Sequence, residues 1–318
     1  MGSFPGHALP GSIFIFLGLW WMHSAWLRYF ICRYRQKPYY VSISFPFHCC
    51  SAGLKLPLES FIVLFGTSLG IVVELGTGLE KTVDQDGISS YSFAANNLQH
   101  FTMYFMFFLV GIVELLQHYH IALPSHIGVV VGILAFSAEG LLFYFHVHAR
   151  DPVDIQLHIL LVLSIGAIII SSICELAQPQ PKQVYPTLMR AYFTVLQGSW
   201  FYQIAFILYS PFHAHYDFAN DPVQHRTLML ISYYFVWHMS IILLILLLFA
   251  IGSYYLSKRY RHVADLGYEQ SFLIHETNID ISDNYQDAAE YDVNMINSEK
   301  KVLTNGRTEE KMNIGNSL

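Results

Sequence analysis

The chain has 318 residues, of which 54% are hydrophobic and only 13% are charged. Soluble domains carry about 25% charged residues, so this composition, with a mean hydropathy of +0.39, excludes an ordinary soluble protein. The net charge is −6, and the 16 histidines nearly equal the 17 Lys and Arg residues in number.

Seven apolar runs follow one another along the chain, each near the roughly 20 residues that a helix needs to cross a bilayer. None of them has the two-residue alternation that is typical of a membrane β-strand. The sequence therefore predicts an all-α, multi-pass transmembrane bundle of seven helices. The predicted spans are 9–29, 57–79, 98–121, 126–148, 155–177, 187–210 and 227–256.

Basic residues predict the orientation of these spans, because cytosolic loops carry an excess of Lys and Arg. The first connection is basic, the second is acidic, and basic residues return after the fifth and seventh spans. We therefore expect the N-terminus outside the cell or in a lumen and the C-terminus in the cytosol.

The last segment differs in character from the predicted membrane domain, residues 1–256. Residues 257–318 hold 7 Lys or Arg and 11 Asp or Glu among many Asn and Ser residues. Such a composition buries too little apolar surface to offset the entropy of ordering, so we expect a disordered cytosolic tail. This tail is a candidate site for trafficking partners.

Ionisable side chains inside the spans are the best indication of function, because they are costly in lipid and usually face the bundle interior or water. Four residues of the third span have spacings of 7, 7 and 4 and therefore share one helix face: His100, Phe107, Glu114 and His118. Residues of the fourth and fifth spans pair on one face in the same way: Glu139 with His146, and Asp154 with His158.

Several histidines fall at one depth near the predicted outer face. They are His100, His146, His148, His158 and, slightly deeper, His238. Imidazole is a common ligand of zinc and iron, and three or four imidazoles around one ion leave a position for water. We therefore predict that these five histidines form a zinc or iron site. Asp154 would orient His158, as carboxylates do for metal-bound histidines.

A metal-bound water could attack an ester, amide or similar group of a lipid-like substrate that enters from the membrane lipids, or the metal site could oxidise or hydroxylate that substrate. Three carboxyl groups are the candidate catalytic residues beside the metal: Glu139, Asp154 and Glu175. Asp154 has the orienting role, and Glu139 or Glu175 could move protons. The sixth span adds the polar lining residues Arg190, Gln197 and Gln203.

Other functions remain open at this point. Histidines also join membrane helices by hydrogen bonds, which would suit a non-enzymatic trafficking or scaffold protein. A small transporter is a third reading, although no internal repeat supports it. The chain has no Gly-x-Ser-x-Gly or His-Glu-x-x-His motif, and its acidic character argues against nucleic-acid binding. The sequence leaves the oligomeric state open.

Six strings stand out along residues 1–256. They are Gly6-His7-Ala8-Leu9-Pro10-Gly11, Gly18-Leu19-Trp20-Trp21, His100-Phe101-Thr102-Met103-Tyr104, Phe143-Tyr144-Phe145-His146-Val147-His148-Ala149-Arg150, Leu196-Gln197-Gly198-Ser199-Trp200-Phe201 and Trp237-His238. In this order and spacing they resemble the transmembrane protein 45 family.

The resemblance implies a seven-helix protein of the plasma membrane or of the endomembrane system, such as Golgi, endosome or lysosome. It implies no settled activity. The motif positions of the family coincide largely with the polar residues found above, and they add His7 to the polar lining.

Overall fold

The computed structural model describes residues 3–41, 44–45, 47–49, 54–83, 89–124, 126–147, 150–179, 182–211 and 221–263. The predicted tail beyond residue 263 and His148 lie outside the described residues. The chain divides into two compact units, Met1–Arg259 and Tyr260–Leu318. The helix bundle belongs to the first unit.

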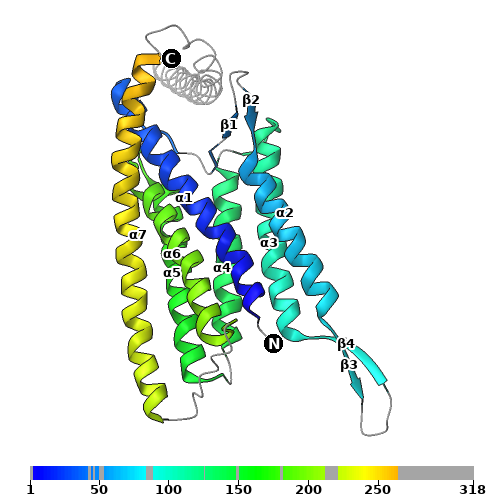
Figure 1. Ribbon diagram of the computed structural model, residues 1–318. Helices are drawn as coiled ribbons and strands as arrows, with labels where there is room; N and C mark the ends of the chain where they lie inside the picture. The colour runs from blue at the N-terminus through cyan, green and yellow to red at the C-terminus, as the bar shows by residue number, and fades with distance from the viewer. Residues whose placement is uncertain are drawn as a thin grey trace, which may run out of the picture. The chain divides into compact units, whose positions relative to one another are not determined.

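Within the described ranges the chain forms seven helices, one in each apolar run (Figure 1). The middle five begin and end close to the predicted spans, whereas the first and the last helix extend further at both ends. The predicted spans follow the apolar residues only, so they miss helical turns that lie outside the apolar runs. The first helix begins earlier than predicted because Ser3 caps it, accepting a hydrogen bond from the Gly6 N–H at 3.2 Å. The helices are α1 (Phe4–Tyr34), α2 (Leu58–Thr77), α3 (Ala95–His118), α4 (Ile127–His146), α5 (Pro152–Ala177), α6 (Tyr185–Leu208) and α7 (Asp221–Val263).

Two short antiparallel hairpins depart from the all-α prediction. β1 (Phe47–Cys49) pairs with β2 (Leu54–Leu56), and β3 (Leu79–Val83) pairs with β4 (Ser89–Phe93). Strands of three to five residues contain too few alternations to be recognised in a sequence dominated by helical runs. The second hairpin projects from the end of α2 and α3 (Figure 1).

Six of the described helices, all except α6, are long and apolar enough to cross a membrane. Helix α6 contains Arg190, Gln197 and Gln203, which lower its hydropathy. Most of its residues are buried between the other helices. A helix that is enclosed by protein can carry these polar groups because it does not meet lipid with them.

Glycines allow α1 and α6 to approach at backbone distance. A Cβ atom on Gly198 would lie 2.7 Å from the Ile15 backbone nitrogen and 2.8 Å from the Gly11 carbonyl oxygen. A Cβ atom on Gly18 would lie 2.8 Å from the backbone nitrogen of Val195. Such small residues are what close helix packing in a membrane requires, because van der Waals contact replaces the hydrophobic effect there.

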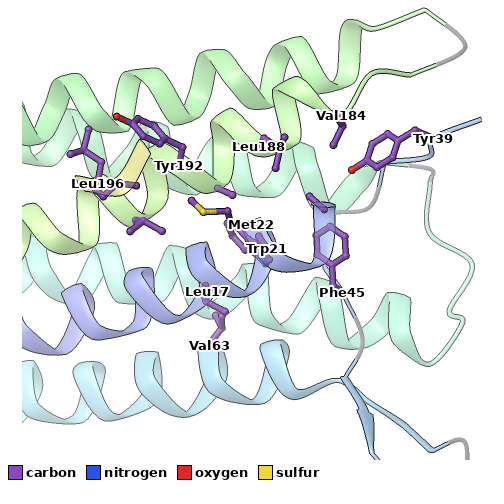
Figure 2. Close-up of a cluster of buried hydrophobic side chains, with 14 residues drawn as sticks. Leu17, Trp21, Met22, Tyr39, Phe45, Val63, Val184, Leu188, Tyr192 and Leu196 are labelled. Atoms are coloured by element: carbon purple, nitrogen blue, oxygen red, sulfur yellow. The ribbon is translucent and has the colours of Figure 1, made fainter. Parts of the chain in front are cut away.

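Large apolar side chains fill the space between these two helices toward the end of α1. Trp21 and Met22 of α1 pack with Leu188, Tyr192 and other buried residues of α6 (Figure 2). Beyond the helix ends, the loop residues Tyr39 and Phe45 close the same cluster (Figure 2). The core therefore fixes the α1–α6 pair, on which the site described below depends.

Helix α7 is attached by polar contacts and by apolar side chains such as Ile231 and Ile242, which are buried in the core. The Gln156 Nε2 amide of α5 donates to Ser232 Oγ at 2.9 Å, and the Tyr192 hydroxyl of α6 donates to the Met239 carbonyl at 2.8 Å. The other faces of α7 expose many large apolar side chains, among them Leu244 and Leu248. Interhelical hydrogen bonds together with a lipid-compatible surface are typical of a helix at the edge of a membrane bundle.

Candidate functional site

Four histidines from four helices lie together at one end of the bundle, where α1, α3 and α5 begin and α4 ends. They are His7 (α1), His100 (α3), His146 (α4) and His158 (α5), and we call them the histidine cluster. Neighbouring ring centroids are 6.2 Å apart for His7–His158, 5.8 Å for His158–His146 and 5.5 Å for His146–His100. The up-and-down order of the helices brings these positions to one level.

The ring of His158 is fixed by a carboxylate one helical turn earlier. Its Nδ1 atom lies 2.7 Å from Asp154 Oδ1 and 2.9 Å from the Asp154 carbonyl oxygen. Both oxygens are acceptors, so Nδ1 carries the proton and Nε2 carries the lone pair. The His158 side chain is only 1% exposed, which holds this orientation in place.

The ring of His7 has the same tautomer for the same reason, and His100 Nδ1 faces a carboxylate. His7 Nδ1 lies 3.0 Å from the Ser3 carbonyl oxygen. His100 Nδ1 lies 3.3 Å from Glu74 Oε1, while the Asn97 amide donates to the other Glu74 oxygen at 2.9 Å. The rings of His7 and His158 thus direct Nδ1–H to a carbonyl oxygen and keep the Nε2 lone pair for another partner, while His100 Nδ1 lies near a carboxylate.

His146 differs from these three because both of its nitrogens are already hydrogen-bonded. The Arg150 guanidinium donates to His146 Nε2 at 2.8 Å, so Nδ1 carries the proton and donates to Gln99 Oε1, also at 2.8 Å. His146 therefore joins α3, α4 and the α4–α5 connection.

Arg150 is the cation of the cluster, and it also pairs with Asp154 Oδ2 at 2.8 Å. Partial burial alone would lower the pKa of Arg150, but the hydrogen bond and the charge of Asp154 outweigh it and raise the pKa above its ordinary value. The guanidinium consequently stays charged and holds Asp154 ionised beside His158.

Among the residues that the structure describes, no three His, Cys, Asp or Glu side chains are already arranged to hold a metal ion. In metal sites, the nitrogen that does not bind the metal donates to a carboxylate or carbonyl oxygen, as it does here in His7 and His158.

A cavity of about 70 Å³ adjoins the histidine cluster, and His7 and His100 are part of its wall. Its lining is mainly apolar, and it reaches Glu139 in α4. The Gln197 amide donates to both Glu139 oxygens, at 2.9 and 3.0 Å. The lining residues are Gly6, His7, Pro10, Ile13, Phe14, Leu17, Val63, Thr67, His100, Met103, Tyr104, Phe107, Glu139, Phe143 and Phe201.

His238 lies apart from the histidine cluster. Its Nδ1 atom is 2.9 Å from Ser199 Oγ, its Nε2 atom is 3.3 Å from Gln203 Oε1, and its ring meets Trp200 edge-on at 5.5 Å. His238 and Gln203 thus connect α7 to α6, which is the hydrogen-bonding role that the sequence left open for histidines.

Glu175 and Arg190 form a separate buried ion pair near the other end of the bundle. Arg190 Nε lies 2.8 Å from Glu175 Oε2, and the side chains are 4% and 0% exposed. Glu175 is 17 residues from His158 along α5, about 26 Å at 1.5 Å per residue. This distance separates the pair from the chemistry of the histidine cluster.

Sequence reasoning missed Glu74, Gln99 and Arg150 as partners of the histidines. A signal for Glu74 was present, since a carboxylate inside the predicted span 57–79 should face the bundle. Gln99 precedes His100, but its bond to His146 depends on how α3 and α4 pack. Arg150 follows His146 by four residues, and this local spacing was a signal for their bond.

The helices and the similarity to known proteins define an integral, multi-pass membrane protein. Residues 125–251 match a family described only as a family of unknown function (DUF716). The matched part includes His146, Asp154 and His158 but not His7 or His100.

Known relatives are transmembrane proteins as well. The chain is 25% identical over 267 residues to transmembrane epididymal protein 1A of Mus musculus, covering 80% of this chain and 82% of the relative. It is 26% identical over 266 residues to transmembrane epididymal protein 1 of Rattus norvegicus, with the same coverage. With transmembrane epididymal protein 1 of Homo sapiens it shares 29% over 146 residues, covering 45% and 51%. None of these three carries the name of the transmembrane protein 45 family, so that resemblance remains a prediction.

Proposed function

We propose that the protein is a metal-dependent enzyme within the membrane, which acts on a lipid-like substrate at the histidine cluster. The ligands of the proposed zinc or iron ion are the Nε2 atoms of His7, His100 and His158. One observation carries the proposal: in His7 and His158, Nδ1 lies within hydrogen-bond distance of a backbone carbonyl oxygen, which leaves Nε2 as an acceptor, and His100 Nδ1 lies 3.3 Å from the Glu74 carboxylate. Asp154 and Glu74 are the carboxylates that would orient two of the ligands.

The adjoining cavity supports a lipid-like substrate. It is lined mainly by apolar residues, and two of the proposed ligands form part of its wall. Three imidazole ligands leave a position for water, whose pKa a bound ion lowers toward 7. Hydrolysis of an ester or amide is the favoured reaction, because water is its co-reactant, whereas an oxidation would need an electron donor as well.

A non-enzymatic scaffold or trafficking protein is the second candidate. The observation in its favour is that each ring of the cluster already contacts an oxygen or guanidinium group in the described part of the chain, as His238 does elsewhere. In this reading the histidines only join helices, and the protein binds no metal.

Metal analysis distinguishes the two candidates. The full chain, purified in nanodiscs without chelator, is expected to contain about one zinc or iron ion. His158→Ala and His100→Ala should lose it, because each removes one of three ligands. Asp154→Asn should weaken metal binding by about 10–100-fold, because it removes an orienting carboxylate. The measurement is elemental analysis by mass spectrometry together with a metal titration.

His238→Ala is the matched control, because it removes a half-buried imidazole that lies outside the cluster. It should keep the full metal content. Folded wild-type protein without stoichiometric metal would exclude the metalloenzyme and favour the scaffold. Equal metal loss in His238→Ala and His158→Ala would exclude the proposed ligand set.

We also propose that all seven helices cross the membrane, with the histidine cluster near the outer or lumenal face and the C-terminus in the cytosol. That α6 crosses the membrane is supported by its length of 24 residues and by its enclosure between other helices. Support for the orientation comes from the basic connection after α1 and from Lys258, Arg259 and Arg261 near the end of α7.

A further inference from the structure

Glu139 is a buried carboxyl group that has no cationic partner among the residues the structure describes. It lies at membrane depth in α4 and is only 3% exposed. Within the described ranges no Lys, Arg or His forms an ion pair with it, and its hydrogen-bond donor is the neutral Gln197 amide. An ionised carboxylate in such a place is very unfavourable unless a cation joins it.

The Gln197 side-chain amide contains a second polar atom without a partner among the described residues, its Oε1 oxygen. Gln197 is fully buried, and its Oε1 atom has no hydrogen-bond partner among the described residues. Because Oε1 and the donating Nε2 belong to one amide, this acceptor lies within a few ångströms of the Glu139 carboxyl group. Buried acceptors without a donor are rare in folded proteins and point to a missing ligand or water.

Aromatic rings form much of the cavity wall near Glu139. Phe14 lies 5.5 Å from Phe107 and 6.0 Å from Phe201, measured between ring centroids, and Phe201 lies 5.7 Å from Phe143. Together with Tyr104 these residues line the cavity that reaches Glu139. Aromatic faces attract organic cations, and the attraction grows when the cation is removed from water.

The space is sufficient for a small polar group with part of an alkyl chain. A water molecule needs at least about 10–15 Å³ of such space, whereas the cavity measures about 70 Å³. An alkylammonium group would give Glu139 its missing cation, and its hydrocarbon chain would contact the apolar wall.

We infer that this cavity is a binding site for an amine-bearing amphiphile, whose ammonium group pairs with Glu139 between the aromatic rings. The inference goes beyond the proposed function, because amine binding at Glu139 does not require a metal ion at the histidine cluster. The two proposals can therefore fail separately.

The test compares three probes of equal chain length that differ only in the polar group: n-octylamine, 1-octanol and octanoate. Binding to the full chain in zwitterionic nanodiscs at pH 7 is measured by titration calorimetry, with empty nanodiscs as the blank. Octylamine is expected to bind at least about tenfold more tightly than octanol, because an ion pair with charge-assisted hydrogen bonds replaces a neutral contact. Octanoate should bind most weakly.

Glu139→Gln should abolish the preference for the amine over the alcohol, whereas His238→Ala should retain it. Phe107→Leu is a second variant that keeps the carboxyl group, and it should reduce the preference about two- to fivefold by removing one ring. Equal binding of octylamine and octanol by the wild type would overturn the inference. So would an undiminished amine preference in either Glu139→Gln or Phe107→Leu.

Discussion

Arg190→Met is expected to lower the free energy of unfolding by about 3–5 kcal/mol, because it leaves the carboxylate of Glu175 buried without its cation. The Arg190 Nε atom lies 2.8 Å from Glu175 Oε2, and the guanidinium also lies 4.5 Å from the centre of the Trp21 ring. Thr187 donates a further hydrogen bond to Glu175 at 2.7 Å, which cannot compensate for the lost charge.

Denaturant unfolding of detergent-solubilised protein measures this effect. The double variant Glu175→Gln with Arg190→Met should recover much of the loss, because neither member of the pair is then left charged without the other. Arg226→Met is the matched control: Arg226 is exposed on α7, and its loss should change stability by less than about 0.5 kcal/mol. If Arg190→Met were as stable as Arg226→Met, the ion pair would not have the role described.

Gly198→Ala is expected to destabilise the bundle by about 1–3 kcal/mol. The added Cβ atom would lie 2.7 and 2.8 Å from backbone atoms of α1, which cannot move aside as a flexible side chain can. The two helices must therefore separate, and the loss of contact should exceed the gain in helix propensity, which is about 1 kcal/mol.

Gly166→Ala is the control for the gain in helix propensity that any glycine-to-alanine change in a helix brings. Gly166 also lies within a helix, but a Cβ atom there would meet nothing within 4 Å. This variant should be neutral or slightly more stable in the same unfolding measurement. Equal stability changes for the two variants would contradict the close contact of α1 and α6.

The existence of the seven helices could be predicted from the sequence, because long apolar runs determine them almost alone. The helix ends at α1 and α7 could not, because they depend on capping residues and on polar turns beyond the apolar core. The two hairpins were missed because strands of three to five residues leave hardly any periodic pattern in the sequence.

Part of the candidate site could also be predicted. His100, His146 and His158 were placed at one depth from the sequence, and the structure brings them together. That His238 lies outside the histidine cluster and that His7 belongs to it could not be predicted, because the depth of a residue along its helix does not tell which helices are neighbours. The bond between Arg150 and His146, which occupies the Nε2 atom, was not foreseen although it spans only four residues, because it forms where α4 ends and the apolar pattern of the span stops.

His7, His100 and His158 are the proposed metal ligands, each through Nε2. X-ray absorption at the metal edge of the purified full chain tests this ligand set, because it counts the coordinating imidazoles and measures their distances. The wild type and His238→Ala should show three imidazole nitrogens at about 2.0–2.1 Å. His7→Ala should show two. An imidazole count that stays the same in His7→Ala, or wild-type protein without a bound metal, would contradict the claim.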